Sequence, residues 1–228
     1  MIKAVCIEIG AYTASFRVPH LHGHQLTLDV PPPSTIFGLL SAAKGEWVLP
    51  GEGLPWIAYC LTYEGKGEDL ETIIAYDRGR PLFKRGEIVR NIFRREFLLN
   101  PRLTLYLPER PWVGSFQRPR FPLVLGRSQD VAYVLRIREA VNLEPVNEGE
   151  VSGVLLPYRL VFGSGTPALI YNLPVAFESP YQRRLLGMKI FGIIREPWTV
   201  KGENFLVRDG QTGRVIPRYT HEWLLSED

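Results

Sequence analysis

Three histidines alternate with other residues near the start of the chain, at His20, His22 and His24, and Tyr12 precedes them. In an extended segment, residues two apart face the same side, about 7 Å apart, so such imidazoles could hold a metal. Histidine and tyrosine can also act as general acid and base, which would suit RNA cleavage. Within this stretch no carboxylate or thiol completes a metal site. We therefore expect no metal, and favour contact with RNA or a protein partner over catalysis.

A second group of candidates lies where three prolines run into a helical pattern. Pro31 to Pro33 keep the chain extended, and Ser34 follows as a candidate N-cap with Thr35 beside it. Helical spacing then continues to Gly45, so we predict a helix over residues 34–44. Its N-terminus, with four unpaired N–H groups and the positive end of the helix dipole, could bind a phosphate. The alternative is that this segment is only a well-capped helix start.

The third candidate is a glycine turn, GRSQD, over residues 126–130 between two apolar runs. Gly126 would let the backbone approach a ligand closely, while Arg127 and Ser128 can bind a phosphate or a base edge. Asp130 could orient Arg127 or cap the turn. The pattern matches neither a Walker loop nor a dinucleotide fingerprint, and many hairpin turns share it.

Charge is distributed unevenly around these candidates. The chain carries a net charge of +3, but residues 78–138 hold fourteen Lys or Arg and four Asp or Glu, a net +10 that leaves −7 for the rest. Thirteen of the fourteen cations are Arg, which suits forked phosphate contacts. This bias indicates a polyanion partner; the alternative is a solvated basic face, or one paired with the acidic remainder.

The elements that must position these residues can be read from apolar spacing. Residues 2–9, 55–64, 70–76 and 103–107 have the alternation or composition of strands. The basic excursion between them predicts a projecting β-hairpin over about residues 78–102, with a mostly polar tip that needs a partner to explain it. Arg118 and Arg120 lie in a connector rich in proline and arginine that leads to the glycine turn.

The overall composition is that of a globular protein with a packed core. Cys6 and Cys60 lie in apolar runs without paired spacing, so we expect buried free thiols in a reducing cytoplasm. No apolar run approaches the ~20 residues of a membrane span, and residues 1–10 lack the long apolar segment and the small-residue cleavage site typical of a signal peptide. We expect two parts, residues 1–145 and a small β-rich region over 146–228, because the sequence turns acidic between Ala140 and Glu150.

Four motifs, taken in order, resemble one known family. They are ASFR (14–17), VPPPSTIFGLL (30–40), LYLP (105–108) and PLVLGRSQD (122–130). Together they resemble the CRISPR-associated "Cas five" family of the RAMP superfamily, a subunit of type I Cascade complexes. The likeness covers about the first 140 residues, and the last third is compatible only in length and character.

The resemblance implies an α+β fold: a ferredoxin-like, RRM-like N-terminal domain with a β-hairpin thumb and a small C-terminal β region. It implies a role in antiviral defence, gripping the 5′ handle of the CRISPR RNA and capping one end of the complex against its backbone and large subunits. Target DNA would be met only through the complex, with no cofactor. The residues expected to bind RNA are Arg17, Ser34, Thr35, Arg90, Arg94, Arg95, Arg118, Arg120, Gly126, Arg127 and Ser128.

One branch of that family cleaves precursor RNA without a metal. The ASFR and PPPST motifs resemble the other branch, in which a separate nuclease cuts. We therefore expect a non-catalytic subunit, with a metal-independent endoribonuclease using Tyr12 or the three histidines as the alternative.

Overall fold

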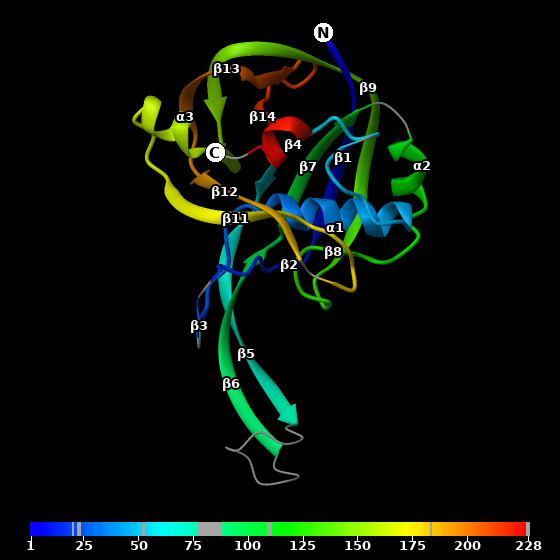
Figure 1. The fold of residues 1–228 in the computed structure, drawn as a ribbon, viewed down its shortest axis with the longest axis vertical. Coiled ribbons are helices and arrows are strands. Elements are labelled where there is room, and N and C mark those ends of the chain that lie inside the picture. The colour runs from blue at the N-terminus through cyan, green and yellow to red at the C-terminus, as the bar shows by residue number, and fades with distance from the viewer. Residues whose placement is uncertain are drawn as a thin grey trace.

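A computed structural model describes residues 1–19, 21, 24–51, 53–76, 88–108, 111–182 and 184–226. Strands dominate it, and the helices are short (Figure 1). None of the helices in these ranges has the length and apolar character of a membrane span. In chain order the elements are β1 (Ile2–Ala11), β2 (Thr13–Ala14), β3 (His24–Gln25), α1 (Pro33–Lys44), β4 (Trp56–Thr62), β5 (Gly65–Tyr76), β6 (Ile88–Leu99), β7 (Arg102–Pro108), α2 (Trp112–Gln117), β8 (Leu123–Val124), β9 (Val131–Val151), β10 (Val154–Pro157), α3 (Tyr158–Gly163), β11 (Leu169–Phe177), β12 (Leu185–Ile194), β13 (Trp198–Asp209), β14 (Val215–Thr220) and α4 (His221–Leu225).

The first two thirds of the chain form a ferredoxin-like unit. Its elements follow the order β1-α1-β4-β7-α2-β9, and the strands lie side by side as β4-β7-β1-β9, each antiparallel to its neighbour. In a βαββαβ chain this strand order places both helices on one face of the sheet. The predicted α+β, ferredoxin-like fold is confirmed.

The C-terminal strands close this sheet into a ring. β9 has 21 residues; its first half pairs with β1, and its second half pairs with β13. β13 pairs with β14, and β14 returns to β4 at the far edge of the sheet. The division expected after residue 145 falls inside β9 and stays a prediction about domain organisation.

A long β-hairpin projects from the sheet where β4 passes into β5 and β6 returns to β7 (Figure 1). β5 and β6 are paired at twelve positions, from Gly65–Leu99 to Tyr76–Ile88. The projecting hairpin was predicted, but its paired strands begin at Gly65, well before residue 78. Residues 65–67, which lie between the predicted strands 55–64 and 70–76, belong to β5 itself. Residues 77–87, on which part of the hairpin prediction falls, lie outside the described ranges.

Two apolar cores lie on opposite faces of the sheet. One fills the space between the sheet, the helices α1 and α2, and the second sheet, β10-β12-β11, which lies on α1. The other fills the interior of the ring and includes Cys6, Cys60 and Tyr106. Both cysteines are free and buried, as expected. Burial raises the pKa of the Cys6 thiol to about 11 and also raises that of Cys60, so both thiols stay protonated.

The N-terminus of α1 differs from the prediction. The N-cap is Pro32, Pro33 occupies the first helical position, and no side chain caps the helix, so the expected Ser34 cap is wrong. Since neither proline has an N–H, the expected set of four free donors is wrong too. The Thr35 N–H donates to the Pro32 carbonyl at 2.9 Å. The C-terminal stop is confirmed: Gly45 has φ 85° and donates its N–H to Ser41.

Candidate nucleic-acid interface

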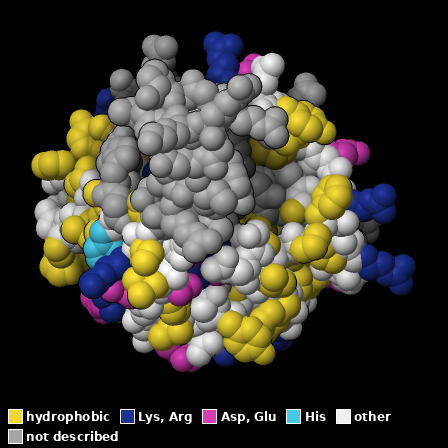
Figure 2. Space-filling model, turned by 90° about the horizontal axis from the view of Figure 1, so that it is seen from below, with side chains coloured by type: hydrophobic (Ala, Val, Ile, Leu, Met, Phe, Trp, Pro, Cys, Tyr) yellow, Lys and Arg dark blue, Asp and Glu magenta, His cyan; other side chains and the backbone are white. Residues whose placement is uncertain are grey.

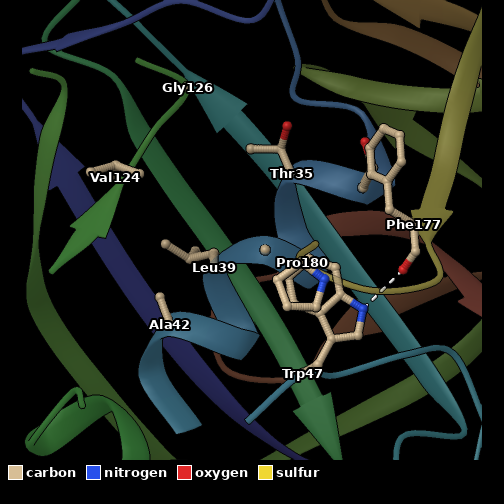
Figure 3. A pocket seen from close by; sticks show the side chains of 10 residues that line it. Thr35, Leu39, Ala42, Trp47, Val124, Gly126, Phe177 and Pro180 are labelled. Atoms are coloured by element: carbon tan, nitrogen blue, oxygen red, sulfur yellow. Dashed lines mark hydrogen bonds between the residues drawn. The ribbon is translucent and has the colours of Figure 1, made fainter. Parts of the chain in front are cut away.

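A cavity of about 330 Å³ lies where the start of α1 faces the glycine turn. Ser34, Thr35 and Gly38 line it from α1, and Gly126 lines it from the turn after β8. Figure 3 shows Thr35, Leu39 and Ala42 along the helix, with Val124 and Gly126 facing them. The structure therefore brings together three residues that the sequence predicted as RNA-binding, although 91 residues separate Thr35 from Gly126.

Residues that sequence reasoning missed close the other side of this cavity. Trp47, Phe177 and Pro180 line it, and Trp47 Nε1–H donates to the Phe177 carbonyl at 2.9 Å (Figure 3). That bond fixes the end of β11 against the loop after α1. The signal in the sequence was weak, because Phe177 and Pro180 come from the C-terminal third, where no motif pointed to this site.

The glycine turn packs against the ASFR motif. Gly126 has φ 108°, and a Cβ placed on it would lie 2.0 Å from the Ser15 carbonyl oxygen. The Ser15 N–H also donates to the Leu125 carbonyl at 3.2 Å. Glycine is thus required here by the backbone angle and by the close approach. The partner in that close approach is the chain's own backbone.

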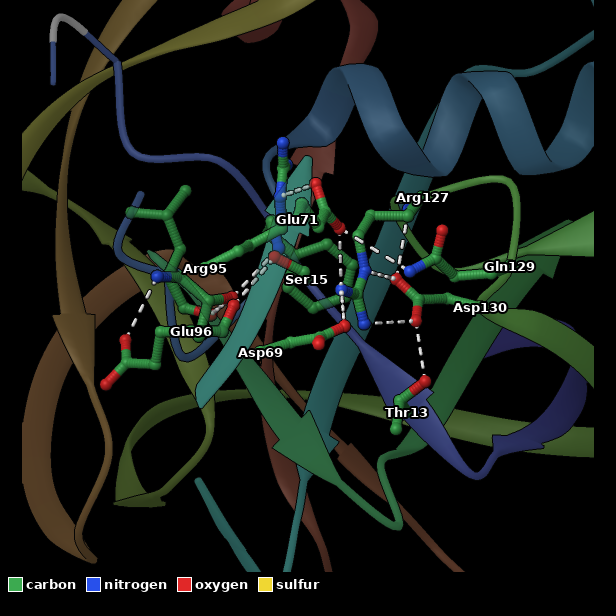
Figure 4. A network of polar contacts seen from close by, with 12 residues as sticks. Thr13, Ser15, Asp69, Glu71, Arg95, Glu96, Arg127, Gln129 and Asp130 are labelled. Carbon is green, nitrogen blue, oxygen red and sulfur yellow. Dashed lines mark hydrogen bonds and ion pairs between the residues drawn. The ribbon is translucent and has the colours of Figure 1, made fainter. Parts of the chain in front are cut away.

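Arg127 holds the turn to the hairpin (Figure 4). Its guanidinium makes a two-pronged contact with the buried carboxylate of Asp130, at 2.9 and 3.0 Å, and donates to Glu71 of β5 at 3.0 Å. It also lies 5.5 Å from the centre of the Phe97 ring. Burial alone would lower the Arg127 pKa, but the contacts with Asp130 and Glu71 raise it. Asp130 therefore orients Arg127, which was one of the two roles expected.

A second set of bonds ties the ASFR motif to β6. Ser15 Oγ–H donates to the Glu96 carbonyl at 2.9 Å, and the Thr27 N–H donates to Glu96 Oε2 at 3.0 Å. Lys66 lies 2.9 Å from Asp29 and 3.4 Å from the Glu96 carboxylate. The ASFR motif, which packs against the glycine turn, is therefore tied to the base of the hairpin by polar contacts.

The hairpin arginines have different environments. Arg95 pairs with Glu71 at 2.7 Å and its side chain is 19 % exposed, whereas the side chain of Arg94 is 69 % exposed and lies 4.0 Å from Glu68. Arg90 lies in β6, but its side chain falls outside the described part. Arg94 is therefore the hairpin cation most available to a ligand among the side chains that the structure describes.

Two other predicted arginines lie near the C-terminal end of α1, away from Ser34 and Thr35. Arg118 and Arg120 are exposed after α2, and the Arg120 N–H donates to the Ala43 carbonyl at 3.1 Å. Ala43 is nine residues from Ser34 along α1, roughly 14 Å. Arg17 is exposed and forms a β-bridge with Thr27, and Ser128 is exposed in the glycine turn.

The residues of the nuclease alternative are only partly described. His20 and His22 lie outside the described ranges; His24 is exposed and lies 3.2 Å from Glu68. Tyr12 is next to Thr13, which pairs with Leu99, whereas His24 pairs with Arg94. Five residues along β6 correspond to roughly 17 Å, so Tyr12 and His24 are not brought together. Among the residues described, no group of three or more His, Cys, Asp or Glu side chains could hold a metal.

The described Lys and Arg side chains do not form a continuous surface on the side seen in Figure 2. There, Lys and Arg side chains are scattered among hydrophobic and acidic ones. Arg95, Arg127 and Arg138 pair with acidic residues, as the alternative reading of the charge bias expected. Five further cations of the segment lie outside the described ranges: Arg78, Arg80, Lys84, Arg85 and Arg110.

No protein-family model and no curated protein sequence matches the chain. Solved structures do match it. A chain of a "CRISPR RNA-guided surveillance complex" is 18 % identical, with 92 % of this chain and 97 % of that chain covered and a TM-score of 0.52. A chain of the "Type III-B Cmr-beta bound to cognate target RNA and AMPPnP" is 10 % identical over 92 % and 98 %, with a TM-score of 0.57. Another chain, from the Type III-B Cmr-beta bound to cognate target RNA, is 10 % identical. The match covers 98 % of this chain and 100 % of that chain, with a TM-score of 0.53. The fold is therefore shared, over nearly its whole length, with subunits of CRISPR RNA-guided complexes.

Proposed function

We propose that this chain is a CRISPR RNA-binding subunit of a type I Cascade complex. It grips the 5′ handle of the guide RNA and caps one end of the complex in the cytoplasm, in contact with the backbone and large subunits. The observation that carries the proposal is the convergence of three distant motifs: the start of α1 and the glycine turn line one cavity, and ASFR packs against that turn.

Three further observations support this role. The fold resembles chains from RNA-guided CRISPR complexes over almost its full length. The hairpin projects from the sheet (Figure 1) and carries two strongly exposed apolar side chains, Leu70 and Ile92, at 67 % and 71 %. Exposed apolar residues on a projecting element are typical of a surface that contacts a partner. The residues that we propose to contact RNA directly are Arg17, Ser34, Thr35, Ser128, Arg90 and Arg94.

Filling the cavity tests the proposal. Gly38 lies on α1 in the cavity lining, and a Cβ there would meet no atom within 4 Å. We expect Gly38→Leu to fold normally and to weaken binding of handle-bearing guide RNA about tenfold in the reconstituted complex, since about 1–3 kcal/mol is lost with one good base or phosphate contact. Filter binding with native and scrambled handles measures it.

Gly114→Leu is the matched control, because Gly114 lies in α2 with equally open space and is not part of the cavity lining. It should leave the RNA affinity unchanged. Equal affinity of the wild-type complex for native and scrambled handles would rule out the handle-binding role. Incubation of the chain with repeat RNA and EDTA addresses the nuclease alternative, and we expect no defined cut.

A further inference from the structure

A second exposed surface lies on the sheet face opposite α1. Side chains of β1 alternate between the faces, so that Ile7 and Ile9 pack toward α1 whereas Cys6 lies inside the ring. Gly10 and Tyr12 continue the alternation of Cys6. The C-terminal end of β1 is not covered by the interior of the ring. Tyr12 there is 77 % exposed, and Tyr133 of β9 is 44 % exposed.

Gly10 makes this surface possible. It is paired with Tyr133, and a Cβ on it would lie 3.3 Å from Tyr133 Cε2 and 3.1 Å from Leu135 Cδ1. The Tyr133 and Leu135 side chains therefore lie across the glycine. The Tyr12 ring centre is 6.1 Å from that of Tyr133, with the rings tilted by 54°. Two aromatic rings and a leucine form a continuous exposed platform.

Cations flank this platform on both sides. Arg102 of β7 is paired with Gly10, and Arg136 of β9 is paired with Glu8; both arginines are exposed. The register shift between Glu8 and Ile9 leaves Leu135 without a paired residue on β1, between Val134 and Arg136, at an irregularity in β9. The Glu8 carboxylate, 3.8 Å from Arg138 Nε, is outnumbered by Arg102 and Arg136, so the flanks of the platform keep a positive balance.

We propose that this platform stacks an unpaired nucleobase, with Arg102 and Arg136 contacting the adjoining phosphates. Aromatic side chains beside arginines are the usual means of holding single-stranded RNA without reading its sequence. A neutral protein surface would match the tyrosines but not the two arginines. The inference rests on the proposed function, since it adds a second RNA contact to a chain that binds RNA at the cavity.

Tyrosine variants in the reconstituted complex test this. We expect Tyr133→Ala and Tyr12→Ala each to weaken binding of the handle-bearing guide RNA about fivefold or more, and the corresponding Phe variants to retain it, because the ring is what stacks. Phe162→Ala is the matched control; that aromatic side chain is 72 % exposed on α3, outside both the cavity lining and the platform, and its loss should change nothing. Guide RNA with 4-thiouridine should crosslink to peptides containing Tyr12 or Tyr133.

The outcomes separate this inference from the proposed function. If Gly38→Leu weakens RNA binding but the tyrosine variants do not, and no crosslink maps to the platform, the platform is not an RNA site and the handle role stands. If the wild-type complex binds no RNA, both fail. Weaker association of protein subunits with unchanged RNA affinity would make the platform a protein contact and also overturn the inference. Leu135→Ala is the second variant if a tyrosine variant does not fold.

Discussion

At the scale of single residues, Arg127 has a different environment from the one that its place in a glycine turn suggested. The sequence indicated a cation that could bind a phosphate or a base edge, with Asp130 as a residue that could orient it. In the structure the Arg127 guanidinium makes its two-pronged contact with Asp130, which is 1 % exposed. A third guanidinium nitrogen, Nη1, donates to Glu71. Arg127 is therefore placed to shape the turn that lines the cavity, and the proposed RNA binding would depend on Arg127 through that shape.

Removing the Arg127 guanidinium should therefore lower the free energy of unfolding, and RNA affinity should fall only as a consequence. Arg127→Ala leaves the Asp130 carboxylate buried with only Thr13 and backbone donors, so we expect the free energy of unfolding to fall by about 3 kcal/mol. Arg127→Lys should recover only part of this, since lysine cannot make the two-pronged contact. Urea denaturation measures it, and RNA affinity should fall in step. Weaker RNA binding at unchanged stability would show instead that the guanidinium contacts RNA directly.

At the scale of elements, the hairpin β5–β6 is the part most easily separated from the core. Its register allows Ile73 and Asn91, which are paired, to be joined by Asn-Gly in place of residues 74–90. That deletion removes five Lys or Arg but keeps Glu71 and Phe97, which contact Arg127.

We expect the shortened chain to keep its unfolding temperature and to bind guide RNA with a shallower dependence on salt. The slope should fall by about 0.7 for each phosphate contact that is lost. The double variant Lys201→Gln, Arg208→Gln removes exposed charge elsewhere and should leave the slope as it was. An unchanged slope in the deletion would mean that the hairpin does not contact RNA.

The elements also show what could be predicted from the sequence. Strand alternation and the glycine after α1 identified the sheet, the first helix and the hairpin, because these depend on local spacing. The cap of α1 was mispredicted because prolines occupy the positions that a serine cap would need. Trp47, Phe177 and Tyr133 were missed as surface and site residues, since only the fold brings the first two together and only Gly10 exposes the third.

At the scale of the whole molecule, a buried ion pair joins three strands of the ring. Asp209 of β13 accepts from Arg138 of β9 at 2.6 Å and from Tyr106 of β7 at 2.8 Å. Burial alone would raise the Asp209 pKa, but the bonds from Arg138, the Gln211 N–H and Tyr106 outweigh it and lower that pKa from 3.8 to about 2. Since the folded pKa is below the unfolded one, the ionised carboxylate stabilises the ring above about pH 4.

Acid unfolding tests this pair. The contribution of Asp209 should be present above pH 4 and lost as the pH falls toward 2. We expect Asp209→Asn to be less stable by about 3 kcal/mol at pH 7, and to lose less further stability between pH 4 and 2 than the wild type. Glu148→Gln, on the exposed side of β9, is the control. Parallel pH profiles for wild type and Asp209→Asn would contradict this role; Tyr106→Phe offers a milder variant if the first does not fold.

The hairpin is continuous with two neighbouring strands of the ring, and this has a mechanical consequence. A pull along the hairpin, such as a taut nucleic acid would exert, enters the ring through β4 and β7 and shears them against their outer neighbours. β7 is held to β1 by seven paired positions, whereas β4 is held to β14 by three. We therefore expect β4 and β14, which share fewer paired positions, to separate first under such a load. This is the contact through which the C-terminal strands close the ring.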